Sequence, residues 1–320
     1  LLTAFLLSAL PVAYIIHKET AARDTHAFEY RARGWFRECA KWDAPNRRFV
    51  VSFFEGGVGV VPVSDGDGDA AGSEEALEEI PVVVNDAGLG KNSSLGLAID
   101  APRNRVLVAI ADVLGNKYGA VAAYDLTTWN RLFLTRLAGV EDEKSFADDV
   151  AVDGDGNGYI TDAKGNKIWK IGADGELLDT IRNPLFAAAE WYRNLVGLNG
   201  IVFHPNGYLL VIHTFTGNLF KVDVGDGHRV KLVGGVSGGP LRFGDGLELL
   251  SPTRLVVAGN PSRLVETSDD WETGSVLGKF AGASHRIVTA ATVKDGKVYL
   301  NHILGLGYPN KKHLLVEAVF

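Results

Sequence analysis

The stretch GYLLVIHTFTGNLFKVD, residues 207–223, contains two runs rich in β-branched and aromatic residues, with a Thr-Gly turn between them. This arrangement predicts a β-hairpin. The same pattern occurs five more times along the chain, at residues 47–63, 105–126, 157–171, 253–267 and 296–320. Helical periodicity is almost absent between these stretches, so the sequence predicts an all-β fold.

A pair of residues, usually one hydrophobic and one polar, marks each copy of the repeat. The pairs are Trp42-Asp43, Ile99-Asp100, Val152-Asp153, Phe203-His204, Leu249-Leu250 and Val293-Lys294. Their first members are 57, 53, 51, 46 and 44 residues apart. A repeat of this length has room for about four short strands, as a propeller blade does. We therefore predict a six-bladed β-propeller over residues 36–320.

The residue four places before each pair indicates chemistry at the centre of the ring. These residues are Glu38, Leu95, Asp148, Asn199, Asp245 and Thr289. Because innermost strands surround the central channel of a propeller, equivalent positions converge around its axis. Four of the six carry side-chain oxygens suited to a hard cation, and an oxygen-only set favours Ca²⁺ over zinc or copper. The alternative is a water-filled channel that polar residues merely line.

Composition and charge narrow the classes of partner. The chain has 320 residues, a net charge of -7 and no Lys/Arg-rich run, which argues against a nucleic-acid backbone as partner. Cys39 is the single cysteine, so no intramolecular disulfide can form, and we expect a buried structural thiol. We expect a monomer that binds a small-molecule substrate.

Two acidic stretches resemble the start of a calcium-binding EF-hand loop. In the stretch that begins at Asp153, Lys164 stands where that loop requires a bidentate Glu. The stretch that begins at Asp65 fails in the same way, because its twelfth position is Ala76. We therefore interpret residues 153–158 as a hairpin turn and residues 64–80 as an exposed acidic insertion.

The N-terminal residues 1–16 are mostly apolar, but they are fewer than the roughly 20 that span a bilayer comfortably. We interpret residues 1–17 as a signal peptide or signal-anchor, with a buried helix as the alternative, and residues 18–35 as a linker. A membrane contact is expected only through this segment if it is not cleaved. The protein would then enter the secretory pathway (ER, vacuole or extracellular space), where Asn92, in Asn92-Ser-Ser94, is a candidate glycosylation site.

Four short signatures resemble those of a known family. They are Glu38-x-x-x-Trp42-Asp43, Asp148-Asp149-Val-Ala-Val-Asp153, Leu198-Asn199-Gly200-Ile201 and Gly244-Asp245-Gly246-Leu247. In this order they resemble the gluconolactonase, senescence-marker-protein and luciferin-regenerating-enzyme-like family, and most closely its plant branch described as calcium-dependent phosphotriesterase-like. The resemblance covers residues 36–320.

The resemblance implies a six-bladed propeller with one catalytic divalent metal, usually calcium, held by a Glu, two Asn and an Asp. Glu38, Asn199 and Asp245 match that set directly. Asp148 stands where the family usually has Asn, so the site would be more acidic than usual. The implied activity is hydrolysis of a lactone or another ester, phosphotriesters included, with Asp245 as the general base.

Other functions are compatible with the same residues. His213, His285 and His302 are alternative bases if one of them reaches the channel mouth. A non-hydrolytic propeller is the main alternative: a condensing enzyme resembling strictosidine synthase, or a binding or storage protein that calcium stabilises. Residues 183–197 are expected to form a short helix or lid, in which Trp191 and Tyr192 either cover the mouth or pack on a neighbouring blade.

Overall fold

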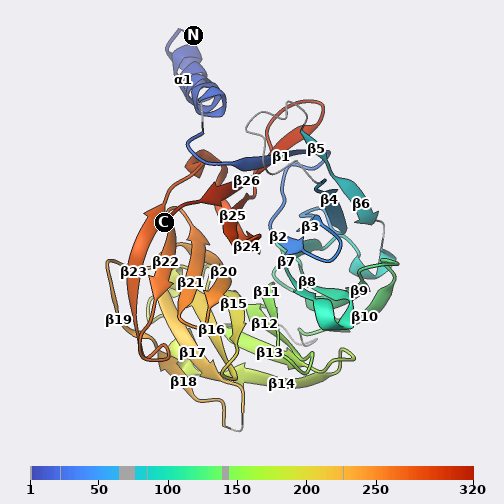
Figure 1. Ribbon diagram of the computed structural model, residues 1–320, viewed down its shortest axis with the longest axis vertical. Helices are drawn as coiled ribbons and strands as arrows, with labels where there is room; N and C mark the ends of the chain where they lie inside the picture. The colour runs from blue at the N-terminus through green and yellow to red at the C-terminus, as the bar shows by residue number, and fades with distance from the viewer. Residues whose placement is uncertain (1, 22, 65–75, 85, 139–143, 226) are drawn as a thin grey trace.

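The structure, a computed structural model, describes residues 2–21, 23–64, 76–84, 86–138, 144–225 and 227–320. Its strands form six sheets arranged in a ring around a central axis (Figure 1). The predicted six-bladed β-propeller is therefore confirmed. Residues 65–75, which hold most of the acidic insertion and the second EF-hand-like stretch, lie outside the described residues.

The strands of each blade follow one another outward from the axis in antiparallel order. Blade 1 consists of β2 Ala40–Asp43, β3 Arg48–Ser52, β4 Val58–Pro62 and β6 Ile80–Val83. Blade 2 consists of β7 Ser93–Asp100, β8 Arg105–Ala111, β9 Gly119–Asp125 and β10 Arg131–Arg136. Blade 3 consists of β11 Ala147–Val152, β12 Gly158–Asp162, β13 Lys167–Ile171 and β14 Leu177–Arg182.

The later blades keep this order and add short extra elements. Blade 4 consists of β15 Leu198–His204, β16 Tyr208–His213, β17 Asn218–Asp223 and β18 Val230–Leu232. Blade 5 consists of β20 Gly244–Ser251, β21 Arg254–Gly259, β22 Ser262–Glu266 and β23 Thr273–Phe280, with β19 Gly234–Ser237 parallel to β23. The 3₁₀ turns are η1 Ala87–Leu89, η2 Ala101–Arg103, η3 Pro184–Phe186, η4 Trp191–Asn194 and η5 Ser284–Arg286.

Blade 6 joins the two ends of the chain. It consists of β24 Val288–Lys294, β25 Lys297–His302, β26 Lys311–Ala318 and β1 Ala27–Ala32, with β5 Leu77–Glu78 parallel to β1. The structure thus differs from the linker expected over residues 18–35. Phe28 and Tyr30 are buried and alternate with more exposed residues, a strand pattern that the mixed charge of the segment hid. By pairing with β26, β1 closes the ring.

The core lies between neighbouring blades. Six clusters of buried apolar side chains are present among the described residues, and each cluster draws on at least two adjacent blades. Val50 and Val106, for example, belong to one cluster that joins blades 1 and 2. Full burial of such a side chain stabilises the fold by about 1.5–3 kcal/mol. The blades therefore depend on one another for stability.

The described chain begins with α1 Leu2–Thr20, which extends beyond the rim of the ring next to β1 and β26 (Figure 1). Its end is fixed by Glu19, which accepts hydrogen bonds from the buried Arg286 (Nε at 2.7 Å) and contacts His285. Among the described residues, no helix has the length and apolar character needed to cross a membrane.

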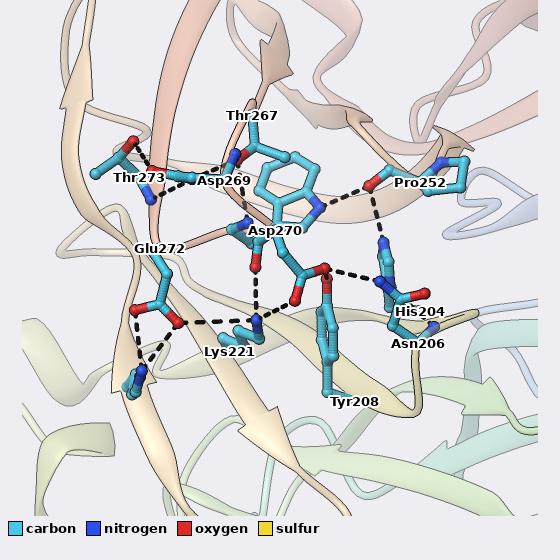
Figure 2. A network of polar contacts seen from close by, with 12 residues as sticks. His204, Asn206, Tyr208, Lys221, Pro252, Thr267, Asp269, Asp270, Glu272 and Thr273 are labelled. Atoms are coloured by element: carbon cyan, nitrogen blue, oxygen red, sulfur yellow. Dashed lines mark hydrogen bonds and ion pairs between the residues drawn. The ribbon is translucent and has the colours of Figure 1, made fainter.

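A polar network ties blade 4 to blade 5 (Figure 2). It lies where the inner strands finish, because His204 is the last residue of β15 and Pro252 directly follows β20. The Asp270 carboxylate accepts hydrogen bonds from Tyr208 Oη at 2.7 Å and Lys221 Nζ at 2.7 Å. Beside it, the indole of the buried Trp271 donates to the Pro252 carbonyl at 2.9 Å. These contacts connect β16 and β17 to the loop between β22 and β23.

Candidate functional site

The innermost strands carry an irregularity at the same place in five of the six blades. Their pairing with the second strand skips one residue within 94–97, 147–150, 198–201, 244–247 and 288–290. Such β-bulges re-aim side chains out of the regular alternation. Leu95, Asp148, Asn199, Asp245 and Thr289 lie inside these bulges, and Glu38 lies just before β2. The equivalence that we inferred from the repeat is therefore present in the structure.

Glycines let neighbouring inner strands approach closely at the bulges. A Cβ on Gly200 would lie 2.2 Å from the Asp245 carbonyl oxygen, and a Cβ on Gly246 would lie 2.8 Å from the Thr289 carbonyl oxygen. These contacts are with backbone atoms, which cannot move aside as a flexible side chain can. The close approach brings residues from separate blades to one end of the ring's centre.

The four predicted cation ligands lie near one another at this end. Asp148 and Asn199 are 7% and 6% exposed, and the Asn199 side chain hydrogen-bonds the Asp245 carboxylate. The charges of Asp148 and Asp245 both act on Glu38. Glu38, Asp148, Asn199 and Asp245 therefore form an acidic group at the centre, named here the central acid group.

Burial and mutual repulsion disfavour ionisation of these acids. Burial, reinforced by the negative charges of Asp245 and Asp148, raises the pKa of Glu38 well above its usual range. Burial and the negative charges of Asp245 and Asp149 likewise raise the pKa of Asp148 well above its usual range. Burial and the charge of Asp149 raise the pKa of Asp245 to about 7, although hydrogen bonds from Asn199 and the Gly246 backbone lower it. The positive charges of the protein therefore do not offset the negative charge of the central acid group.

The donor chemistry of this group fits a hard divalent cation. Three carboxylates and one amide supply oxygen ligands, and Oε2 of Glu38 is buried without a hydrogen-bond partner. Within the described ranges, no three His, Cys, Asp or Glu side chains come close enough together to hold a metal by themselves. A cation here would thus depend on the Asn199 amide and on further oxygens in addition to the carboxylates.

Lys41 and Asp149 are site residues that the repeat comparison missed. The Lys41 side chain reaches from β2 to Glu248 Oε2 of blade 5 at 2.6 Å and to the Ala291 carbonyl of blade 6 at 2.8 Å. Burial alone would lower the pKa of Lys41, but the negative charges around it, that of Glu248 first, together outweigh burial and raise the pKa. Lys41 and Glu248 also line a cavity of about 340 Å³ to which all six inner strands contribute. The ion pair therefore lies between the central acid group and this cavity.

Asp149 follows Asp148 inside the bulge of β11 and faces the neighbouring blade. Its carboxylate accepts hydrogen bonds from the backbone N–H groups of Val150 at 2.8 Å and Ile201 at 3.4 Å. Burial raises the pKa of Asp149 to about 6, and the charge of Lys41 opposes that rise. The adjacent acids Asp148 and Asp149 were the sequence signal for this second site residue. Which of the two side chains faces the centre depends on the bulge in β11, and the sequence alone did not show that bulge.

The backbone of Glu38 is held from two sides. Asn301 Nδ2 donates to the carbonyls of Arg37 at 2.7 Å and Glu38 at 2.9 Å, and Thr289 Oγ1 also donates to the Glu38 carbonyl. The guanidinium of Arg37, itself 2% exposed, pairs with both carboxylate oxygens of Glu79 at 2.6 and 2.9 Å. Bidentate pairs of this kind fix orientation as well as charge. Thr289 thus helps to fix the backbone of Glu38.

The three alternative bases differ in their surroundings, and Nε2 of both His213 and His302 is buried without a hydrogen-bond partner among the described residues. His213 and His302 are buried in β16 and β25, and burial lowers the pKa of each to about 4. His285 contacts Glu19 at the end of α1.

The candidate glycosylation site, Asn92, is half-buried just before β7 and donates to the Leu89 carbonyl at 2.8 Å, while the Ser94 of its sequon is fully buried. Glycosylation at Asn92 stays a prediction.

Two expected surface features can be compared with the structure. Residues 183–197 form the 3₁₀ turns η3 and η4 instead of one short helix. Trp191 is 77% exposed and Tyr192 46% exposed, so neither ring is buried against a neighbouring blade. The stretch at Asp153 is the expected hairpin turn, in which the Asp153 carboxylate accepts from the backbone N–H groups of Asp155 and Asn157.

Similarity to known proteins is detected at the level of structure. No protein-family model matches the sequence, and no curated protein matches it. A gluconolactonase from Xanthomonas campestris is 16% identical, with 92% of this chain and 90% of that chain covered and a TM-score of 0.55. A glucose dehydrogenase is 15% identical (92% and 100% covered, TM-score 0.56), and a virginiamycin B lyase from Staphylococcus aureus is 9% identical (92% and 100%, TM-score 0.52). Since their names denote three different activities, these likenesses define the class of the chain as a six-bladed propeller and leave its reaction to the site.

Proposed function

We propose that this propeller is a calcium-dependent hydrolase of a lactone or another ester, phosphotriesters included. The observation that carries the proposal is the convergence of Glu38, Asp148, Asn199 and Asp245 from four blades into one acidic, oxygen-only group, of which Asp148 and Asn199 are buried and Glu38 and Asp245 half-buried. A group of this kind is costly for the fold unless a cation offsets its charge. The structural likeness to a gluconolactonase is consistent with the proposal.

The four residues would hold the cation through their side-chain oxygens. A bound calcium ion would polarise the carbonyl or phosphoryl oxygen of the substrate and stabilise the negative charge that develops on it. Asp245 is our candidate general base, because its carboxylate is oriented by Asn199 and by the Gly246 backbone N–H. In that role, an Asp245 carboxylate oxygen would accept the proton of the attacking water. The bulges hold these side chains on strands, which limits their motion.

The test is hydrolysis of a panel of lactones, aryl esters and phosphotriesters by the full chain, with calcium and after chelation. We expect turnover of at least one class that chelation abolishes. Asp245→Asn should lower kcat by about 10²–10⁴-fold, the usual contribution of a general base. Asp174→Asn, an exposed acid on blade 3, should leave the rate unchanged.

Calcium binding without turnover of any class would overturn the hydrolase proposal. It would favour the calcium-stabilised binding protein, in which the ion serves the fold alone.

A further inference from the structure

The six hydrophobic residues that mark the repeat lie together at the end of the ring opposite the bulges. The bulges lie near the start of their inner strands, whereas each marker residue lies near the end of its strand. Because the inner strands surround the axis (Figure 1), these six positions converge there. All six line the cavity of about 340 Å³, named here the far cavity: Trp42, Ile99, Val152, Phe203, Leu249 and Val293.

The wall of the far cavity is apolar but not sealed. Each of the six marker residues is half-buried, so part of every one of these side chains stays accessible. The other apolar residues of the described lining are Ala98, Val150, Ala151, Ile201 and Val202. A concave, mostly apolar surface with few polar groups is the usual form of a small-molecule site, because a ligand removes that surface from water.

An ion pair forms the floor of the far cavity. Lys41 Nζ donates to Glu248 Oε2 at 2.6 Å and to the Ala291 carbonyl at 2.8 Å, which links blades 1, 5 and 6. The described lining contains no member of the central acid group. The far cavity is therefore a second site, separated from the central acid group by this pair.

The floor offers one hydrogen-bond acceptor to a bound molecule. Glu248 Oε1, the carboxylate oxygen that Lys41 does not contact, accepts no hydrogen bond from any described residue. The Glu248 side chain is 22% exposed and lines the cavity. A ligand that donates a hydrogen bond would satisfy this oxygen, and bonds to a charged acceptor are stronger than bonds between neutral groups.

The charges that border the far cavity are matched among the described residues. Lys41 is paired with Glu248. Lys294, whose Nζ lies 5.0 Å from the centroid of the Trp42 ring, is paired with Asp295. A charged ligand would lose its hydration without gaining an unpaired counter-ion, which is costly in an apolar setting. The lining therefore favours an uncharged molecule.

The size of the far cavity limits the ligand to a small molecule. Its volume of about 340 Å³ is more than twice that of an apolar cavity of roughly 150 Å³ that takes one benzene ring. Two fused rings would therefore fit between the six marker side chains.

We propose that the far cavity binds a small, uncharged, apolar alcohol of about two rings. Its hydroxyl would donate to Glu248 Oε1, and its apolar body would lie against the six marker residues. The proposal does not depend on the reaction at the central acid group, since the two sites lie on opposite sides of the Lys41–Glu248 pair.

The test is fluorescence titration of the full chain with 2-naphthol. We expect one site per chain, with the same affinity in calcium and after chelation. The methyl ether 2-methoxynaphthalene has the same rings but no hydroxyl proton, so it should bind at least about tenfold more weakly. The anionic 2-naphthoic acid and the cationic 2-(aminomethyl)naphthalene should also bind more weakly than 2-naphthol.

Variants in the wall would show that binding occurs in the far cavity. Val152→Asp with Val293→Asp should weaken 2-naphthol binding at least about tenfold, because two carboxylates would replace apolar wall. Leu178→Asp with Leu277→Asp makes the same change of charge on the outer strands β14 and β23 and should bind as the wild type does. Both leucines are about half exposed, at 50% and 51%.

Circular dichroism would check that the variants fold. Val293→Asp alone, at a residue outside the six core clusters of the described chain, replaces the double variant if that variant unfolds. Equal affinity of the wild type and the wall variant for 2-naphthol would overturn the proposal. Absence of 2-naphthol binding, binding that requires calcium, or equal or tighter binding of the ether or of either charged analogue would overturn it as well.

Discussion

At the scale of single residues, the site depends on backbone positions as much as on its acids. Asp148 and Asp245 could have been identified from the sequence, because the repeat places them at equivalent positions. The role of Gly200 could not, because it follows from how closely β15 approaches β20. The Lys41–Glu248 pair was also hidden, since its partners come from blades 1 and 5 and no local pattern connects them.

Gly200→Ala should therefore destabilise the protein and disturb the site. The added methyl would lie 2.2 Å from the Asp245 carbonyl oxygen and 2.7 Å from the Leu247 nitrogen, so the two strands would have to separate. Overpacking of this kind typically costs about 1–3 kcal/mol. Urea unfolding would measure the change.

Gly154→Ala is the matched control for this substitution. A Cβ at Gly154 would meet no atom within 4 Å, so its free energy of unfolding should stay within about 0.5 kcal/mol of the wild type. Equal stability of the two variants would contradict the close-packed bulge.

At the scale of elements, the N-terminal segment is where sequence reasoning was least complete. The expected linker contains β1, whose buried Phe28 and Tyr30 alternate within only six residues. Its partner β26 lies at the far end of the chain, so local patterning gave no sign of the pairing. The hairpins were recognisable because both of their strands and the turn are close in sequence.

Docking of α1 should depend on pH through Glu19. Burial alone would raise the pKa of Glu19, but hydrogen bonds from Arg286 and His285 outweigh it and lower the pKa from 4.5 to about 2. A lowered folded-state pKa stabilises the fold above the unfolded value, and this contribution is lost as the pH falls from 4.5 towards 2. Its size is on the order of 2 kcal/mol once solvent screening is allowed for.

The measurement compares urea unfolding of the wild type with that of Glu19→Gln. The variant should be less stable near neutral pH, and the difference should shrink as the pH approaches 2. Glu176→Gln, an exposed acid on blade 3, serves as the charge-matched control. A difference that is constant across this pH range would contradict the ion pair.

At the scale of the whole molecule, six interblade cores make the ring one cooperative unit. The repeat spacing predicted this architecture correctly because each blade needs neighbours to bury its apolar faces. The particular polar contacts that join one blade to the next could not be predicted from the sequence. The network around Asp270 is an example (Figure 2). Asp270 belongs to blade 5, whereas the side chains that donate to it, Asn206, Tyr208 and Lys221, belong to blade 4 and precede it by about 50 residues or more.

Asp270→Ala should weaken the junction of blades 4 and 5 without affecting the central acid group. Removing the carboxylate leaves Tyr208, Asn206 and Lys221 without that acceptor, at a cost of about 1–2 kcal/mol. Thermal unfolding should therefore occur at a lower temperature, while calcium affinity should stay unchanged. Loss of calcium affinity in this variant would contradict the separation of the two ends of the ring.

The convergence of four blades on one cation is tested most directly by calorimetric titration of the full chain with calcium. We predict one site, with binding at least about tenfold weaker in Glu38→Gln and in Asp148→Asn, because each variant removes a charged oxygen ligand. Glu176→Gln makes the same change of charge on the outside of blade 3 and should bind as the wild type does. Absence of calcium binding, or equal affinity in the wild type and Glu38→Gln, would contradict the account.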